Sequence, residues 1–154
     1  MRSKPWIAIV VGLTAVLTAG AALAEDEFTH LWVAETPETI DLGNGVSANV
    51  FVNHGFFIAD DTTNRLHSAN MDCYGTGVGT AEAGEFAGYC TIVPTSGDGR
   101  VWISFQSDQT GGTWTVLRGA GSLKGVSGGG TFGLGGQWPD GKGYNWVKGT
   151  FKLP

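Results

Sequence analysis

Eight short runs rich in β-branched and aromatic residues, separated by clusters of Gly, Asn, Asp and Pro, restrict this chain to an all-β fold. Helical periodicity is nearly absent beyond residue 24. We expect strands at 28–35, 48–59, 66–75, 85–93, 100–107, 113–119, 129–135 and 144–153. Turn signals separate several of them, at 44–45, 96–99, 110–112 and 139–143. This short, regular spacing predicts an eight-stranded antiparallel up-and-down β-barrel.

The first 24 residues have the layout of a secretory signal peptide. Arg2 and Lys4 precede an apolar run over 6–22, and the small-residue site at 22–24 is followed at once by acidic residues. An uncleaved membrane anchor is the alternative, but glycines and threonines interrupt the run. The sequence therefore predicts cleavage after Ala24 and one secreted or periplasmic domain at 25–154.

The predicted mature domain is acidic. It holds all 14 Asp and Glu but only 7 of the 9 Lys and Arg, for a net charge of −7. That charge argues against nucleic acids and anionic membrane surfaces as partners. No second long apolar run follows residue 24, so we expect no membrane span in the mature chain.

Two cysteines, Cys73 and Cys90, are expected to form one disulfide in an oxidising compartment. Buried free thiols are the alternative. The midpoint between the two positions falls at 81–82, inside the glycine-rich TGVGTAEAG segment that reads as a turn. The two cysteines would then face each other across an antiparallel hairpin.

In most predicted strands neither face is purely polar. Phe28, His30 and Trp32 share one face of the first strand, while Leu31 and Val33 share the other. This pattern suits a barrel with an apolar inside and a partly covered outside, or a homo-oligomer that buries part of its outer wall.

The stretch RGAGSLKGVSGGGTF at 118–132 contains six glycines in fifteen residues. A nucleotide-binding loop is excluded, because the glycine spacing is wrong and Lys124 is misplaced for a phosphate loop. A flexible linker is disfavoured, because Leu123, Val126 and Phe132 are spaced through it like packed anchors. We interpret it as a strand, a tight turn and a second strand with bulges, where glycine permits positive φ and close backbone approach.

This stretch, GTWTVLRGAGSLKGVSGGGTF, resembles a segment of the allene oxide cyclase and dirigent-like barrel superfamily, and GYCTIVPTSGDGRVWISF at 88–105 is similar to the strand and turn that precede it there. The resemblance covers about residues 66–152 and is closest to secreted bacterial members of unsettled function. It implies an eight-stranded antiparallel barrel, often trimeric or dimeric in the plant relatives.

The resemblance also implies a pocket inside the barrel. The plant cyclases bind a fatty-acid epoxide there with a carboxylate and a water held by polar groups, and the dirigent relatives use acids on quinone-methide intermediates. Neither set of residues maps onto this chain.

Titratable residues give weaker hypotheses. Asp72 and Glu85 are the catalytic candidates, because each lies in a predicted strand beside aromatic residues, where burial would raise a carboxyl pKa. The histidines fall at spacings that match no local metal-ligand motif, so we expect no metal; they are His30, His54 and His67. The oxygen-rich stretch at 60–64 lacks the spacing of a calcium loop and reads as a solvated turn.

The aromatic residues are the strongest remaining signal. Five are candidates for contacts with a small apolar ligand, although core packing is the alternative for most of them: Trp32, Trp102, Trp114, Trp138 and Tyr144. We expect no cofactor. The first hypothesis is a barrel that binds a small hydrophobic ligand or a partner protein without catalysis. The alternatives are a cyclase or isomerase acting on a hydrophobic intermediate, and an oligomeric envelope protein with no ligand.

Overall fold

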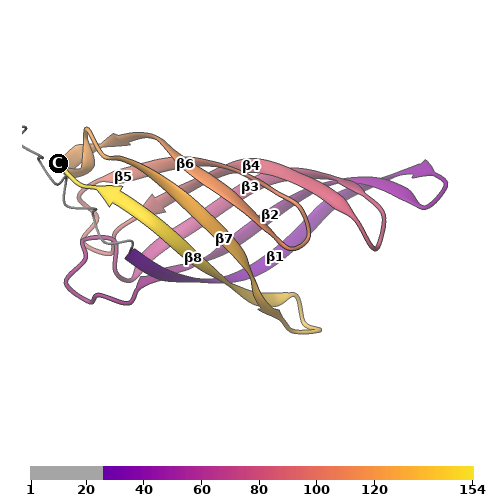
Figure 1. Cartoon of the computed structure of the whole chain (residues 1–154), viewed down its shortest axis with the longest axis horizontal. Helices are drawn as coiled ribbons and strands as arrows, with labels where there is room; N and C mark the ends of the chain where they lie inside the picture. The colour runs from indigo at the N-terminus through magenta and orange to yellow at the C-terminus, as the bar shows by residue number, and fades with distance from the viewer. Residues whose placement is uncertain (1–25) are drawn as a thin grey trace, which may run out of the picture.

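The computed structural model describes residues 26–154, which form one closed antiparallel β-barrel (Figure 1). Each strand pairs with its neighbours in sequence, and β8 pairs with β1. The strands are β1 (Asp26–Gly43), β2 (Val46–Ala59), β3 (Ala69–Gly79), β4 (Gly84–Val93), β5 (Arg100–Ser107), β6 (Gly111–Ala120), β7 (Ser127–Gln137) and β8 (Lys142–Lys152). The predicted fold class is confirmed, with its eight strands in up-and-down order.

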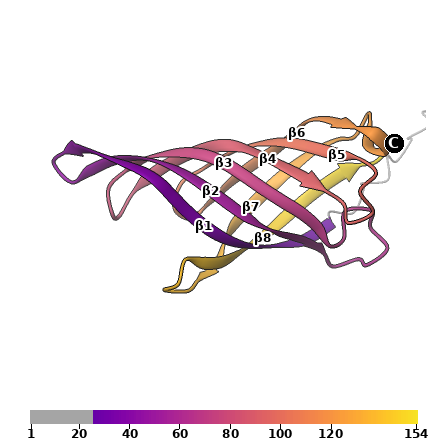
Figure 2. The same cartoon turned by 180° about the vertical axis from the view of Figure 1, so that it is seen from behind.

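The strand predicted at 100–107 has the same bounds as β5 in the structure. The strand predicted at 28–35 differs most from the one observed, β1. It runs for 18 residues and continues past the expected end at residue 35. A register shift between Glu35 and Glu38 accommodates Pro37, which has no N–H to give to a sheet ladder. The Asn44-Gly45 signal then forms the tip of the β1–β2 hairpin, with φ of 54° and 75°. Figures 1 and 2 show this hairpin projecting beyond the other strands.

The seam between β1 and β8 closes the barrel along only part of β1. Its register runs from Asp26↔Gly149 to Val33↔Lys142. On the outside of the seam, Glu27 accepts a hydrogen bond from the Lys148 ammonium at 2.6 Å. The stretch of β1 after Val33 therefore extends past the end of β8 and belongs to the open end of the molecule.

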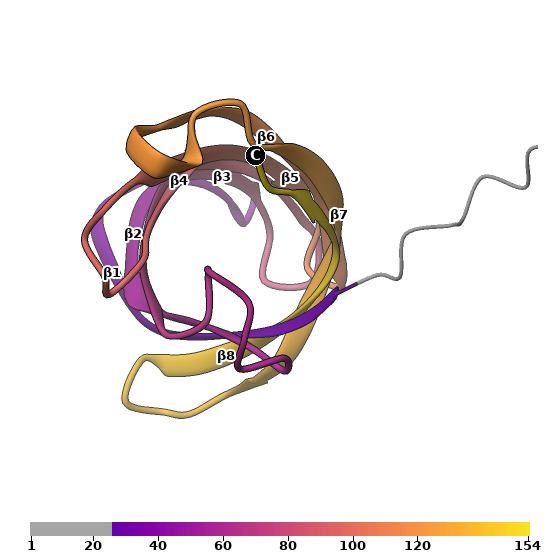
Figure 3. The same ribbon diagram turned by 90° about the vertical axis from the view of Figure 1, so that its left-hand side faces the viewer.

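The opposite end of the barrel is packed solid with apolar side chains. Six of them are almost completely buried: Phe28, Phe57, Leu66, Ile92, Val101 and Leu123. Leu66 comes from the β2–β3 loop, which crosses this end of the barrel in Figure 3, and Leu123 comes from the short 3-10 helix η1 (Gly121–Leu123). Burial of a Leu or Phe side chain contributes roughly 1.5–3 kcal/mol, so this plug stabilises one end of the barrel.

Polar contacts join the loops that carry the plug. The Arg65 guanidinium donates to the Ser122 carbonyl at 3.0 Å, and the Ser122 hydroxyl donates to the Asp98 carbonyl. Three loops distant in sequence are thereby tied over the packed end.

The glycine-rich segment forms this corner, as predicted. It ends β6, makes η1 and begins β7. A Cβ on Gly119 would collide with the Leu123 carbonyl and with the Val126 side chain, so glycine here lets the buried turn pack against β6. Gly121, at φ +61°, starts the turn.

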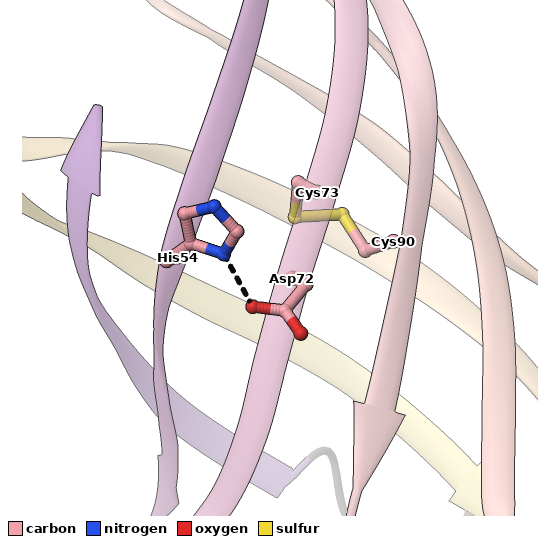
Figure 4. Close-up of a disulfide and its surroundings, with 4 residues drawn as sticks. All are labelled: His54, Asp72, Cys73 and Cys90. Atoms are coloured by element: carbon pink, nitrogen blue, oxygen red, sulfur yellow. Dashed lines mark hydrogen bonds and ion pairs between the residues drawn. A yellow bond between two sulfur atoms is a disulfide. The ribbon is translucent and has the colours of Figure 1, made fainter. Parts of the chain in front are cut away.

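The predicted disulfide is confirmed. Cys73 and Cys90 lie directly opposite each other on β3 and β4 and are bonded (Figure 4). Both are buried on the interior face, and the connection between their strands spans residues 80–83, as the sequence indicated.

The predicted signal peptide, residues 1–24, lies outside the described residues. Within residues 26–154, no helix has the length and hydropathy needed to cross a bilayer.

Replacing Gly119 by alanine should lower the free energy of unfolding by about 2–3 kcal/mol, because the added methyl group forces the buried η1 turn away from β6. Lys124→Ala is the matched control in the same segment, because Lys124 is exposed and has ordinary extended backbone, with φ −61° and ψ 124°. Urea unfolding of both variants checks the prediction. Equal losses for the two variants would contradict it.

Candidate ligand-binding cavity

The half of the barrel away from the plug is hollow. A cavity of about 500 Å³ occupies this half. It opens at the end of the barrel that carries four hairpin turns, at 43–46, 79–84, 107–111 and 137–142. Its aromatic lining consists of Trp32, Phe51, Phe57, Phe86, Phe105, Trp114, Phe132 and Phe151. The disulfide sulfurs and aliphatic side chains such as Ile103 add to this apolar surface.

Glycines on the inner wall make room for these rings. A Cβ on Gly75 would lie 2.5 Å from the Phe51 ring, and one on Gly77 would lie 2.5 Å from the Phe86 ring. Trp32 covers Gly143 in the same way. Each ring therefore lies against the wall over a residue without a side chain, and the centre of this half stays open.

Two polar atoms in the lining have no hydrogen-bond partner among the described residues. They are the Nε1–H donor of Trp32, a residue only 9% exposed, and the Oδ1 acceptor of Asn49. By contrast, Trp114 Nε1 donates to the Lys148 carbonyl at 3.2 Å, and the Trp114 ring stacks on Phe151 at 4.6 Å. Trp114 is thus fixed in the wall, while Trp32 and Asn49 each keep an unpaired polar atom that is buried within the lining.

His30 is the inward-facing residue of β1 that precedes Trp32, on the side of the packed end. It pairs with Phe57 on β2 and with Asn145 on β8. It is 3% exposed and is the one buried polar or charged side chain in residues 26–154. Burial in this apolar surrounding disfavours the imidazolium and lowers the pKa of His30 from 6.5 to about 4, although the negative charge of Asp72 opposes the shift. His30 is therefore neutral at physiological pH.

Asp108 stands at the mouth of the cavity, in the β5–β6 turn. Its Oδ1 accepts hydrogen bonds from the Thr110 hydroxyl at 2.6 Å and the Thr110 N–H at 2.7 Å, and from the Gly111 N–H at 3.1 Å. These bonds, led by the Thr110 hydroxyl, hold the pKa of Asp108 below its ordinary value, so the mouth carries a fixed carboxylate.

The structure brings two of the five predicted ligand contacts into the cavity, Trp32 and Trp114. Trp102 lies on the outer wall with the Arg118 guanidinium 4.2 Å and the Arg100 guanidinium 5.7 Å from its ring centre. Trp138, 51% exposed in the β7–β8 turn, lies near Tyr144, and neither residue is in the cavity lining.

Both catalytic candidates lie on the outer wall. The Asp72 carboxylate is hydrogen-bonded to His54 Nδ1 at 2.8 Å, and both side chains are about half exposed (Figure 4). Glu85 is exposed on β4, opposite Val78. Neither carboxylate lines the cavity.

The other titratable candidates are dispersed. His30 is inside, His54 is outside, and His67 contacts the Ala59 carbonyl at 2.8 Å near the plugged end. In residues 26–154 no three His, Cys, Asp or Glu side chains come together as a metal site would require. The stretch at 60–64 forms a turn in which Asp61 Oδ1 accepts from the N–H and hydroxyl of Thr63.

Sequence reasoning missed most of the lining, although a signal for it exists. Period-two alternation puts Phe105 in phase with Val101 and Ile103, which makes it an inner residue and puts Trp102 outside. The same argument places Asn49 in phase with Phe51. Asp108 gives no such signal, because it lies in a turn, where alternation stops.

No family model matches this chain, and no curated protein matches it by sequence. Solved structures do match in three dimensions. The pterocarpan synthase dirigent protein PsPTS1 aligns with a TM-score of 0.55 over 84% of this chain and 94% of its own, at 12% identity. The pterocarpan synthase dirigent protein GePTS1 aligns with a TM-score of 0.51 over 85% and 90%, at 11% identity.

The fold is therefore that of the dirigent-like eight-stranded barrels, as the resemblance in sequence implied. At these identities the likeness concerns the fold, and the cavity has to be interpreted from its own side chains.

Stability should fall as the pH is lowered from 6.5 to about 4. In that window the unfolded chain binds a proton at His30 and the folded chain does not, so lowering the pH favours unfolding, by about 3 kcal/mol across the window. His30→Phe should flatten this part of the profile, and His54→Asn on the outer wall should keep the contribution of His30. Urea unfolding at a series of pH values tests this, and a His30→Phe profile as steep as that of the parent protein would refute it.

Proposed function

We propose that this protein binds a small, mainly apolar molecule inside its barrel and does so without chemistry. The observation that carries the proposal is the cavity of about 500 Å³, lined by eight aromatic side chains and a smaller number of polar ones such as Asn53 and Asn145. Ligand sites are typically apolar pockets of about 300–1,000 Å³ in which a small number of polar groups fix orientation.

The nature of the titratable groups supports binding over catalysis. A cyclase or isomerase needs an acid or base beside the reacting atoms. The titratable side chain in the lining is Asp108, which is at the exposed mouth and hydrogen-bonded to its own turn. The catalytic alternative rests on fold analogy, and conversion of a bound molecule into a new product would establish it.

We further propose that the protein works after export, in a secreted or periplasmic setting, and that it belongs with the secreted bacterial barrels that its sequence resembles. The Cys73–Cys90 disulfide supports export, because such bonds persist in oxidising compartments. Mass spectrometry of the protein isolated from its own cells would detect cleavage after Ala24.

Asn53 lines the cavity, so Asn53→Trp should fill part of it and weaken binding of the neutral hydrophobic dye N-phenyl-1-naphthylamine by about tenfold, or about 1.4 kcal/mol. Asn70→Trp is the matched control, because Asn70 is exposed on the outer wall of the neighbouring strand. Dye fluorescence titration measures both affinities. Equal effects of the two substitutions, or no dye binding by the parent protein, would refute a ligand site in the barrel.

A second candidate function, association between copies of the chain, is favoured by the outer wall. Large apolar and aromatic side chains are exposed on four adjacent strands: Leu31, Val33, Phe56, Tyr74 and Tyr89. Tyr74 and Tyr89 lie directly opposite each other and are 55% and 62% exposed. Adjacent exposed side chains of this size mark interaction surfaces.

Light scattering of the exported protein should therefore give the mass of more than one copy. Phe56→Lys combined with Tyr89→Lys should reduce it to that of a monomer, since each lysine would bury an unpaired charge in the contact. Thr131→Lys, at an exposed position on β7 outside these four strands, should leave the mass unchanged. A monomeric mass for the parent protein at all concentrations would count against this surface.

A further inference from the structure

We infer that the ligand of the cavity is a hydrophobic cation: an apolar skeleton that carries a protonated amine at its mouth-facing end. This inference rests on the proposed binding function and specifies which class of molecule the site selects. It is carried by the charges around the mouth, by the absence of positive charge from the described lining and by the aromatic rings beside Asp108.

Charge is distributed unequally along the barrel axis. The half that opens into the cavity carries seven acidic side chains, on its hairpins and the strand ends beside them: Glu35, Glu38, Asp41, Glu82, Glu85, Asp108 and Asp140. The same half has one lysine, Lys142, which is paired with Asp140 at 2.6 Å. Six of the other basic side chains lie toward the plugged end: Arg65, Arg100, Arg118, Lys124, Lys148 and Lys152. A cavity mouth that carries charge of one sign raises the local concentration of ligands of the opposite charge.

The lining has no positive group to receive an anion. Among the described residues that line the cavity there is no Lys, Arg or His, and the charged one is Asp108. A carboxylate ligand would therefore lose its hydration without gaining a counter-charge, and it would approach a like charge at the mouth. This argues against fatty acids and other organic anions as ligands.

Several groups near the mouth suit an ammonium. Asp108 uses Oδ1 for all three of its hydrogen bonds to the turn, so its other oxygen, Oδ2, faces no donor of the described chain. Phe86 lies opposite Ser107, the residue before Asp108, and Phe105 is the next inner residue of β5. An ammonium beside these rings gains a cation–π attraction in addition to its hydrogen bonds.

A charge series on one skeleton tests the inference: 1-naphthylmethylammonium, 1-naphthylmethanol and 1-naphthoate, measured by calorimetry at about 20 mM and about 300 mM salt. We expect the cation to bind roughly tenfold more tightly than the alcohol at low salt, and the anion to bind at least tenfold more weakly than the alcohol. The advantage of the cation should shrink at high salt, because its partners are near the solvent-exposed mouth.

Asp108→Asn provides the residue-level test. Asparagine retains an Oδ1 acceptor for the Thr110 and Gly111 bonds, so the turn is kept while the charge is removed. The variant should lose roughly three- to tenfold in affinity for the ammonium and lose less in affinity for the alcohol, so the preference for the cation falls. Asp140→Asn is the matched control, because it removes an equal charge from the mouth outside the lining, and it should retain most of the preference.

The outcomes separate this inference from the proposed function. Equal affinities across the series, or tightest binding of the anion, would overturn the inference while leaving a ligand site in place. Absence of binding by all three compounds together with absence of dye binding would overturn both.

Discussion

The incomplete seam between the first and last strands determines the rest of this structure. Closure removes the free edges of the sheet and creates an inside, but the β1–β8 register ends at Val33↔Lys142, although β1 continues to Gly43. Because a strand that has no partner on one side cannot help to enclose a core, the strands beyond that point form a mouth. Where β1 and β8 are paired, the wall is closed all round, and the cavity reaches into this closed part as far as Asn145 and Val147. The far end is packed because the loop residues Leu66 and Leu123 fill it.

In both halves of the barrel, side chains alternate between the inside and the outside, but the residues at the inward-facing positions differ. In the packed half, interior positions carry large side chains, and two leucines from loops fill the axis, Leu66 and Leu123. In the hollow half, several interior positions are glycines with a ring from a neighbouring strand against them, as Phe51 lies against Gly75. Close packing is thereby reached along the wall and avoided at the centre. The stability of the plug compensates for a cavity that would otherwise weaken a domain of this size.

Much of the fold could be predicted from the sequence, because it depends on local signals. Strand number, order and turns follow from alternation and from Gly, Asn and Asp, and the Cys73–Cys90 pair follows from the turn between its strands. The cavity could be predicted only in part. Trp32 and Trp114 were found from residue type, but a tryptophan at an outer position has the same composition signal as one inside, so Trp102 was indistinguishable without the phase of its strand. Asp108 depends on how four hairpins meet in space, which no local pattern records.

A shared barrel does not determine what the barrel accepts. Closure, twist and strand number set the width of the interior, and these depend on backbone and glycine more than on charge. Charge matters at the mouth and in the lining, where a single side chain can determine which ligands bind. Among the described lining residues the one charged group is the carboxylate of Asp108, held in place by its own turn, and most basic residues of 26–154 lie toward the far end. The cost of desolvating a charge without a partner is several kcal/mol, which exceeds what a few additional apolar contacts return. In a cavity of this kind, the sign of the charge therefore selects the ligand before its detailed shape does.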